Sequence, residues 1–472
     1  MPPPSPDQRF DRRIVEGPLT SAVWHLAWPT MVQNIIGGVQ GILDHAMVGH
    51  FVGYTGNAAI GVSWQIFLIV IVFISSLSTG MAVLVARAAG AGEPDKVNRV
   101  VYQALLTSAV LALALMAPIG YVSTPYLLSL VNAAPEVRQE ALPYLRIMFT
   151  GSLGMLFFFM LGGALRAAGD ARTPLRLGVA MTALHMVLNV VLISGVGPFP
   201  AMGVRGAALG TVIASTTSSI VGLWLLFGHR TPIWFRRDMP WRPDLRIVRS
   251  LFRFGLPSGL QGVVMNIGGL LLLRFIGSLE RSAEAQAAYS VGYGQLFSLI
   301  TWTSVGLMSA AATVAGQNLG AGSPQRAEDA VRATSRIGVL LAGGIGALFL
   351  LAPRTLLSIF GMTEAAVLDL GVQLLRVLGI SGLFVNVALI YTGGLQGTGD
   401  TRSPFYISLI SQVIVPVGLC VVLQRVHDGL EPLDIWLAIL LGHVTRSLLS
   451  VLRFRQGKWR AIRVDIEPAG VR

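Results

Sequence analysis

One aspartate, Asp44, lies in a stretch of the chain that is almost free of charge. Between Ser21 and Gly92 the only other charged side chain is Arg87. A carboxyl group removed from water favours its neutral form, so it can take up and release a proton near neutral pH, and when ionised it attracts a cation. Asp44 therefore has the chemistry of a proton- or cation-binding residue, although an isolated acid of this kind also serves as a structural hydrogen-bonding residue.

Polar and small residues recur at helical spacing before Asp44. Steps of three or four residues backward reach Gln40, Gly37 and then Gln33. Residues at this spacing share one face of a helix. Because polar groups avoid hydrocarbon, this face must contact protein or a water-filled cavity. We predict that Gln33, Gln40 and Asp44 belong to one coupling site for a cation or a proton.

A second polar stripe lies further along the chain. Thr182, His185 and Asn189 again fall at helical spacing on one face. Histidine titrates near neutral pH, so His185 offers a second group that can carry a proton, while Asn189 can orient a carboxyl group by hydrogen bonding. The alternative is that His185 is a packing residue whose hydrogen bonds are satisfied.

The elements that must position these residues are membrane helices. The 472 residues are 53% hydrophobic and 12% charged, with a mean hydropathy of +0.67, which exceeds what a soluble domain carries. Continuous apolar runs predict helices, because a membrane barrel alternates every second residue. We predict an all-α integral membrane protein with twelve transmembrane helices, near residues 20–50, 57–85, 100–124, 142–165, 175–197, 205–227, 251–276, 285–315, 334–352, 371–393, 404–424 and 433–452.

The charge distribution predicts the orientation. If the N-terminus is cytoplasmic, most of the 35 Lys and Arg residues fall on the cytoplasmic side, and the outer side holds Arg138, Arg205, Arg281, Arg354 and Arg425. Both termini are therefore expected inside. The net charge of +12 is explained by anionic lipid headgroups and needs no nucleic-acid partner. The single cysteine excludes an internal disulfide, and no metal site or cofactor is expected.

An internal repeat organises the chain. "GAGEPDKVNR" at 90–99 returns as "GAGSPQRAED" at 320–329, and "ALRAAGDARTP" at 164–174 returns as "GLQGTGDTRSP" at 394–404, both at an offset of 230. Their Gly, Asp and Pro residues are typical of turns between helices. Six helices per repeat predict two pseudo-symmetric six-helix bundles. The expected parts are a cytoplasmic tail at 1–17, bundles at 18–228 and 251–455, a basic linker at 229–250, and a second tail at 456–472.

These paired motifs, with "FPAMGVRGAALGTVIAS" leading into the sixth helix, resemble the multidrug and toxic compound extrusion (MATE) transporters over about residues 18–455. The resemblance implies a secondary antiporter that exports cationic or amphipathic compounds by alternating access. Such an antiporter is driven by a proton gradient or, less favoured, by a sodium gradient, and it needs no cofactor. Pro29 matches a first-helix proline at which such helices bend, and proline also removes a backbone hydrogen bond whatever the family.

The resemblance also bears on the ion. The first-half cation site of the family pairs the first-helix acid with a fifth-helix pattern similar to "LN..LD.LLIFG", whereas this chain has "LHMVLNVVLISG", with His185 at the Asn position and Asn189 at the Asp position. One carboxylate instead of two weakens sodium coordination, so protons are favoured; a sodium ion would have Asp44 and Asn189 as ligands. In the second half Met265 and Val385 replace acids, which resembles the DinF-like branch.

Aromatic, amide and methionine side chains inside the helices are the candidates for a substrate cavity, since such walls suit varied amphipathic ligands. Arg146 and Arg376 are expected to snorkel outward, and Arg274 and Arg446 either snorkel or line the cavity. The cavity candidates are Trp64, Gln65, Met160, Gln261, Asn266, Gln295, Trp302, Asn386 and Tyr391.

Other functions remain open at this stage. A flippase for lipid-linked precursors needs several cations around its cavity, and four intramembrane arginines are all that this chain offers. No motif of a membrane-embedded enzyme is present, and a passive channel does not need a repeat with a titratable acid. We expect a monomeric, non-enzymatic transporter of the bacterial inner membrane, in contact with lipids and a small-molecule substrate.

Overall fold

The computed structural model describes residues 10–464 except 237–238, 240 and 427–428, and this part of the chain is helical without strands. The outermost parts of the two expected tails and three residues of the expected linker lie outside it. The elements in chain order are α1 (Arg13–Glu16), α2 (Leu19–Phe51), α3 (Tyr54–Gly90), α4 (Pro94–Val110), η2 (Leu111–Met116), α5 (Ala117–Leu130), α6 (Pro135–Thr150), α7 (Ser152–Ala167), α8 (Arg172–Ser194), α9 (Val204–Phe227), α10 (Leu245–Gly277), α11 (Ser282–Tyr289), η3 (Ser290–Leu296), α12 (Ser298–Gly320), α13 (Pro324–Leu351), α14 (Pro353–Ser358), α15 (Ala365–Gly397), α16 (Arg402–Leu409), η4 (Ile410–Ile414), α17 (Val415–Val426), α18 (Pro432–Arg455) and η5 (Lys458–Ala461).

The expected membrane architecture is confirmed. Among the described residues, ten helices are long and apolar enough to cross a membrane, and α6 with α7 adds an eleventh span that is bent by 54°. The remaining long helix is α2, with 33 residues. Gln33, Gln40 and Asp44 interrupt its hydrophobic residues. The π-helical segments η2, η3 and η4 each lie inside a longer span.

The chain forms two compact units, whose long segments are 32–259 in the first and 12–31 with 260–464 in the second. These units differ from the expected bundles at 18–228 and 251–455, because the division falls inside α2 and α10. Each division lies two residues after a proline, Pro29 in α2 and Pro257 in α10. A proline inside a helix removes a backbone hydrogen bond, so it is a natural place for a long helix to change its packing partners.

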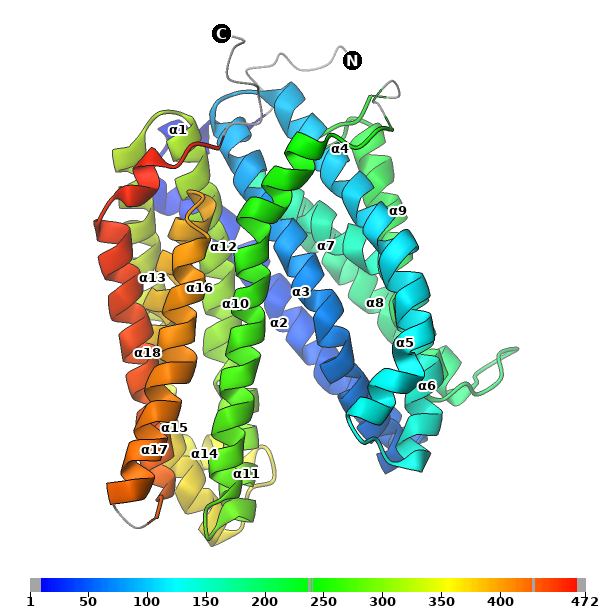
Figure 1. Ribbon diagram of the computed structural model, residues 1–472, viewed down its shortest axis with the longest axis vertical. Coiled ribbons are helices and arrows are strands. Elements are labelled where there is room, and N and C mark those ends of the chain that lie inside the picture. The colour runs from blue at the N-terminus through cyan, green and yellow to red at the C-terminus, as the bar shows by residue number, and fades with distance from the viewer. Residues whose placement is uncertain (1–9, 237–238, 240, 427–428, 465–472) are drawn as a thin grey trace. The chain divides into compact units, whose positions relative to one another are not determined.

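Each unit has a buried apolar core and an apolar outer surface. The core of the second unit includes a stack of rings in which Tyr289 lies between Trp436 and Tyr293, with centroids 6.1 and 5.0 Å apart. Leu340 and Leu351 are instead 78% and 84% exposed. Large leucines exposed on long apolar helices face the hydrocarbon of a bilayer. In Figure 1 the α12–α13 turn lies at one end of this unit and α14 at the other.

Two glycines bring α12 and α15 unusually close together in the second unit. A Cβ atom added at Gly393 would lie 2.2 Å from the carbonyl oxygen of Met308, and one at Gly397 would lie 2.0 Å from that of Ala312. Gly393 and Gly397 are one helical turn apart, so they form a seam of bare backbone along α15. Small residues at this spacing let membrane helices pack through van der Waals contact.

The repeated motifs are turns between helices, as predicted. Gly92 and Gly322 have φ angles of +71° and +74°, and Gly169 and Gly399 have +101° and +99°. Only glycine adopts this left-handed conformation without strain, so each pair ends a helix in the same way. The repeat therefore consists of matched turns, while the side chains that could bind ions differ between the two halves.

Candidate cation and proton site

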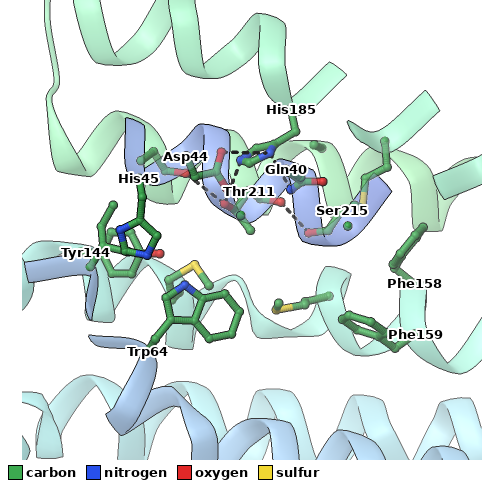
Figure 2. A pocket seen from close by; sticks show the side chains of 18 residues that line it. Gln40, Asp44, His45, Trp64, Tyr144, Phe158, Phe159, His185, Thr211 and Ser215 are labelled. Atoms are coloured by element: carbon green, nitrogen blue, oxygen red, sulfur yellow. Dashed lines mark hydrogen bonds and ion pairs between the residues drawn. The ribbon is translucent and has the colours of Figure 1, made fainter. Parts of the chain in front are cut away.

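Asp44 lies on the wall of a cavity of about 290 Å³ in the first unit. The surrounding side chains come from α2, α3, α6, α7, α8 and α9 (Figure 2). Its polar lining includes Gln40, Asp44, His185, Thr211 and Ser215. The side chain of Asp44 is 23% exposed, so its carboxylate reaches the cavity while most of its surface is covered. The predicted clustering of the α2 and α8 stripes is thus present in the structure.

Asn189 holds the carboxylate of Asp44. Its Nδ2 donates a hydrogen bond to Oδ1 of Asp44 at 2.8 Å, although the two residues are 145 positions apart. Asn189 is fully buried, and its own Oδ1 accepts no hydrogen bond within the described part of the chain. The space beside Oδ1 is available because α9 has a glycine there: a Cβ at Gly210 would lie 2.5 Å from this oxygen.

His185 is enclosed in a chain of hydrogen bonds beside the carboxylate. Its Nδ1 lies 2.7 Å from Nε2 of Gln40 and 3.8 Å from Oδ1 of Asp44. Its Nε2 lies 3.2 Å from Oγ1 of Thr211, and that hydroxyl lies 3.1 Å from the carbonyl oxygen of Ala207. These contacts suit a neutral imidazole with its proton on Nε2. Nδ1 then accepts from Gln40, and Nε2 donates to Thr211.

Gln40 is fixed from both ends of its amide. Its Nε2 meets His185, and its Oε1 accepts a hydrogen bond from Oγ1 of Thr182 at 2.8 Å. The order Thr182, Gln40, His185, Thr211 therefore links α8, α2 and α9 by side chains alone. Such a network holds α2 in one rotational position, which determines where the Asp44 carboxylate points.

The remaining wall of the cavity is largely apolar and adaptable, with His45 and Tyr144 as polar side chains in it. Figure 2 shows Trp64, Tyr144, Phe158 and Phe159 around the space opposite the polar network. Met148, Met155 and Met181 add flexible thioethers to the lining. No Lys or Arg side chain lines the cavity among the described residues. An apolar pocket with one acid is complementary to a compound that combines an apolar body with a positive charge.

The other predicted site residues of the first half lie at different places in the structure. Trp64 lines the cavity, whereas Gln65 is exposed elsewhere on α3 and Met160 is fully buried in α7. Gln33 does not join the network around Asp44. Its Oε1 accepts a hydrogen bond from Nη1 of Arg166 at 3.2 Å, because it lies three helical turns from the acid.

The candidates in the second half are mostly held in the packing of the second unit. Gln261 donates to Ser408 and accepts from Gln396, and Asn386 donates to Ser304 at 2.7 Å. The other four candidates differ in exposure. Asn266 is exposed and donates a hydrogen bond to the backbone of its own helix. Tyr391 is buried in edge contact with Phe454, and the half-buried residues are Gln295 and Trp302.

The intramembrane arginines differ in their exposure and in their contacts. Arg146 stacks on the ring of Tyr121, with 4.3 Å from Cζ to the ring centroid, while Arg274 and Arg376 are exposed. Arg446 is only 3% exposed, so it does not snorkel. Its Nη2 contacts Sδ of Met265 at 3.8 Å, a weak acceptor.

Sequence patterns missed several residues of the site. Tyr144, Thr211 and Ser215 line the cavity, yet none was predicted. Thr211 and Ser215 are one helical turn apart in α9, a spacing that carries a signal only when the partner helices are known. Within the described residues no three His, Cys, Asp or Glu side chains gather so as to hold a metal ion.

Comparison with known proteins agrees with this architecture. The MatE family profile matches residues 29–191 and 257–422, one segment in each half of the chain. The chain belongs to the MatE family. Its curated relatives include a probable multidrug resistance protein NorM of Thermotoga maritima, 27% identical over 92% of both chains. Another is a probable multidrug resistance protein YoeA of Bacillus subtilis, 26% identical over the same shares.

Solved structures show the same fold. One, described as the outward-facing conformation of a multidrug resistance MATE family transporter of the MOP superfamily, superposes with a TM-score of 0.87. It is 21% identical, and the match covers 95% of this chain and 98% of the other. The present chain is thus a multi-pass membrane protein of the MatE family, with the cavity at Asp44 inside its first unit.

Proposed function

We propose that this MatE-family chain is a secondary antiporter of the bacterial inner membrane. It exports cationic or amphipathic compounds from the cytoplasm in exchange for protons, by alternating access. The printed names of its relatives, which refer to multidrug resistance, support this assignment. The excess of Lys and Arg in alternate loops supports a cytoplasmic location for both termini.

The observation that carries the proposal is the position of Asp44 in the cavity. It is the one carboxylate among the residues that line this apolar-walled space. Either a proton or the positive charge of a bound compound neutralises one carboxylate, and the two compete. Proton entry from outside therefore releases the compound, and proton loss to the cytoplasm readies the site for the next one. Exchange follows from this competition.

The donor set supports protons as the driving ion. Sodium prefers several hard oxygen ligands, as other hard cations do. Here Asn189 presents its Nδ2 to Asp44, and His185 adds a nitrogen at 3.8 Å from the carboxylate. A proton needs only the carboxylate and one partner. The single acid, with Met265 and Val385 at the second-half positions where other members of the family carry acids, supports an assignment to the DinF-like branch.

Asn189 can serve both protonation states of Asp44. The ionised carboxylate accepts from Nδ2, as in the structure. After a turn of the amide, the neutral carboxyl group donates its O–H to Oδ1, which has no other partner among the described residues. His185 already has one donor and one acceptor contact, so we assign it the role of a neutral positioning residue for Gln40 and Thr211.

The cavity lining argues against the flippase alternative. A pyrophosphate-linked lipid needs cationic side chains at the site, and arginine is the usual choice. The cavity at Asp44 has an acid and no Lys or Arg among its described lining residues. A negatively charged headgroup would meet repulsion there.

The test is transport in proteoliposomes that contain purified protein. A proton gradient and a sodium gradient are imposed separately, and uptake or efflux of a fluorescent lipophilic cation is followed for wild type and Asp44→Asn. We expect proton-driven transport in the wild type and its loss in Asp44→Asn, because the amide cannot ionise.

Glu136→Gln provides a matched control, since Glu136 is an exposed acid at the start of α6 in the same unit. It should transport like the wild type. Undiminished proton-driven transport by Asp44→Asn would contradict the proposal, and sodium-driven transport by the wild type would contradict the choice of ion.

A further inference from the structure

A second cavity, of about 800 Å³, lies in the second unit and shares no lining residue with the cavity at Asp44. It is formed where α13 ends, with α14 and the beginnings of α15 and α18 around it. Its polar lining consists of Arg354, Thr355, Asp369, Gln373 and Arg376. Figure 1 shows α14 at the end of this unit opposite the α12–α13 turn.

The charged groups of this cavity are two cations, Arg354 and Arg376, and one anion, Asp369. Nη2 of Arg354 lies 3.6 Å from Oδ1 of Asp369, and both side chains are largely exposed. Arg376 is exposed as well. Oε1 of Gln373 is instead buried, and it has no hydrogen-bond partner in the described part of the chain.

The internal repeat shows that the polar side chains around Arg376 in this cavity are specific to the second half. Arg376 corresponds to Arg146 at the offset of 230. Arg146 is covered by Tyr121, whose ring centroid lies 4.3 Å from its Cζ and whose carbonyl oxygen lies 3.4 Å from its Nε. The residue that corresponds to Tyr121 is Leu351, which has no aromatic face to offer to a cation.

The other polar groups are also departures from the first half. The positions that hold Arg354, Asp369 and Gln373 correspond to Thr124, Gln139 and Pro143. In the second half, the cation Arg354, the anion Asp369 and the buried acceptor of Gln373 therefore lie around the exposed Arg376. Charges of both signs in one pocket are complementary to a ligand that carries both.

We propose that this cavity binds a membrane phospholipid with a phosphoethanolamine headgroup. The phosphate lies between the guanidinium groups of Arg354 and Arg376, which match phosphate oxygens in geometry and charge. The ammonium group donates to the exposed carboxylate of Asp369. Leu350, Leu351 and Val377 line the same cavity and contact the glycerol and the first part of the acyl chains.

The depth of the cavity fits a headgroup. α13 and α15 are both membrane spans, and the cavity lies where the first ends at Leu351 and the second begins at Ala365. Interfacial groups of lipids occupy this level. In the orientation proposed above it is the outer leaflet.

Lipid binding to the purified full-length protein in detergent tests the proposal. Native mass spectrometry measures the affinity for dioleoylphosphatidylethanolamine, dioleoylphosphatidylcholine and dioleoylphosphatidylglycerol. We expect the ethanolamine lipid to bind most tightly, because choline has no N–H donor and the glycerol headgroup has no cation. Arg376→Gln should weaken this binding by about tenfold, the usual effect of losing a charged hydrogen bond.

Two further variants make the result specific. Leu351→Tyr copies the first half, should cover Arg376, and should reduce binding as Arg376→Gln does. Arg425→Gln removes an exposed arginine of α17 that does not line the cavity, and it should bind like the wild type. Gel filtration of each variant shows whether it is folded, and a misfolded variant is replaced by Arg354→Gln, which removes the other exposed guanidinium group of the cavity.

Equal affinity for the ethanolamine and choline lipids, or unchanged binding by both Arg376→Gln and Leu351→Tyr, would overturn the proposal. So would free glycerophosphoethanolamine that binds as tightly as the lipid, because the site would then recognise a soluble phosphate compound. None of these readouts depends on transport, so the proposed antiport is tested separately.

Discussion

Nδ2 of Asn189 and Oδ1 of Asp44 lie 2.8 Å apart, which joins the polar stripe of α8 to that of α2. In the proposed cycle, a change of charge on the acid reaches α8 through this contact. A charge-assisted hydrogen bond in a low-dielectric site contributes about 1.5–3 kcal/mol. Changes at either end of it should therefore alter transport measurably.

Asn189→Asp should change the ion preference. It places a second carboxylate beside Asp44 and so adds hard oxygen ligands for a sodium ion. We expect a sodium gradient to drive transport in this variant and not in the wild type, as measured in proteoliposomes. Asn189→Leu, which has similar volume and no donor, should lose transport with either ion. Sodium dependence that is the same in Asn189→Asp and wild type would count against the role of the donor set.

Gly210→Ala should mimic the loss of Asn189. The new Cβ would lie 2.5 Å from Oδ1 of Asn189, so this side chain must move and its bond to Asp44 weakens. We expect proton-driven transport to fall by about tenfold, in line with a charged hydrogen bond. Gly61→Ala is the control, because a Cβ at Gly61 would meet no atom within 4 Å. Normal transport by Gly210→Ala would show that Asn189 has room to adjust.

His185→Gln should keep the pH dependence of transport. Glutamine can accept from Gln40 and donate to Thr211, but it does not titrate near neutral pH. If His185 is a neutral positioning residue, the pH profile of transport stays as in the wild type. His185→Leu should instead lower the stability by about 1–3 kcal/mol, since it leaves buried polar partners unpaired. A pH profile that flattens in His185→Gln would make His185 a second proton carrier.

Gly397→Ala should destabilise the second unit. Its Cβ would lie 2.0 Å from the carbonyl oxygen of Ala312, and backbone cannot move aside cheaply. Overpacking of this kind costs about 1–3 kcal/mol, so we expect a lower melting temperature of the purified protein. At Gly344 an added Cβ meets nothing within 4 Å, and Gly344→Ala should melt like the wild type. Equal melting of the two variants would mean that the seam relaxes.

Much of the fold could be predicted from the sequence because long apolar runs have one stable form in a bilayer. The bend between α6 and α7 could not, since it occurs at Gly151, where a Cβ would lie 2.4 Å from Val212 of another helix. The division between the two units, which falls inside α2 and α10, likewise depends on which helices pack together. The sequence pattern of one helix does not show its packing partners.

The site was predictable where two stripes of polar residues had the same helical spacing. Asp44, Gln40, His185 and Asn189 meet for that reason. Gln33 continues the α2 stripe in sequence, yet three turns of helix separate it from the acid, and it reaches Arg166 instead. Tyr144 and Thr211 lie in helices with several other polar residues, and the sequence does not show which of these face the cavity.

The single carboxylate of the cavity also sets the electrical balance of the proposed cycle. One acid carries one proton inward, and it carries one monovalent cation outward. Such a cycle moves no net charge across the membrane. A membrane voltage does about 2.3 kcal/mol of work per elementary charge at 100 mV, but only on net charge that crosses. The pH difference alone would then supply the driving force, and export of a neutral compound would become sensitive to voltage while export of a monovalent cation would not.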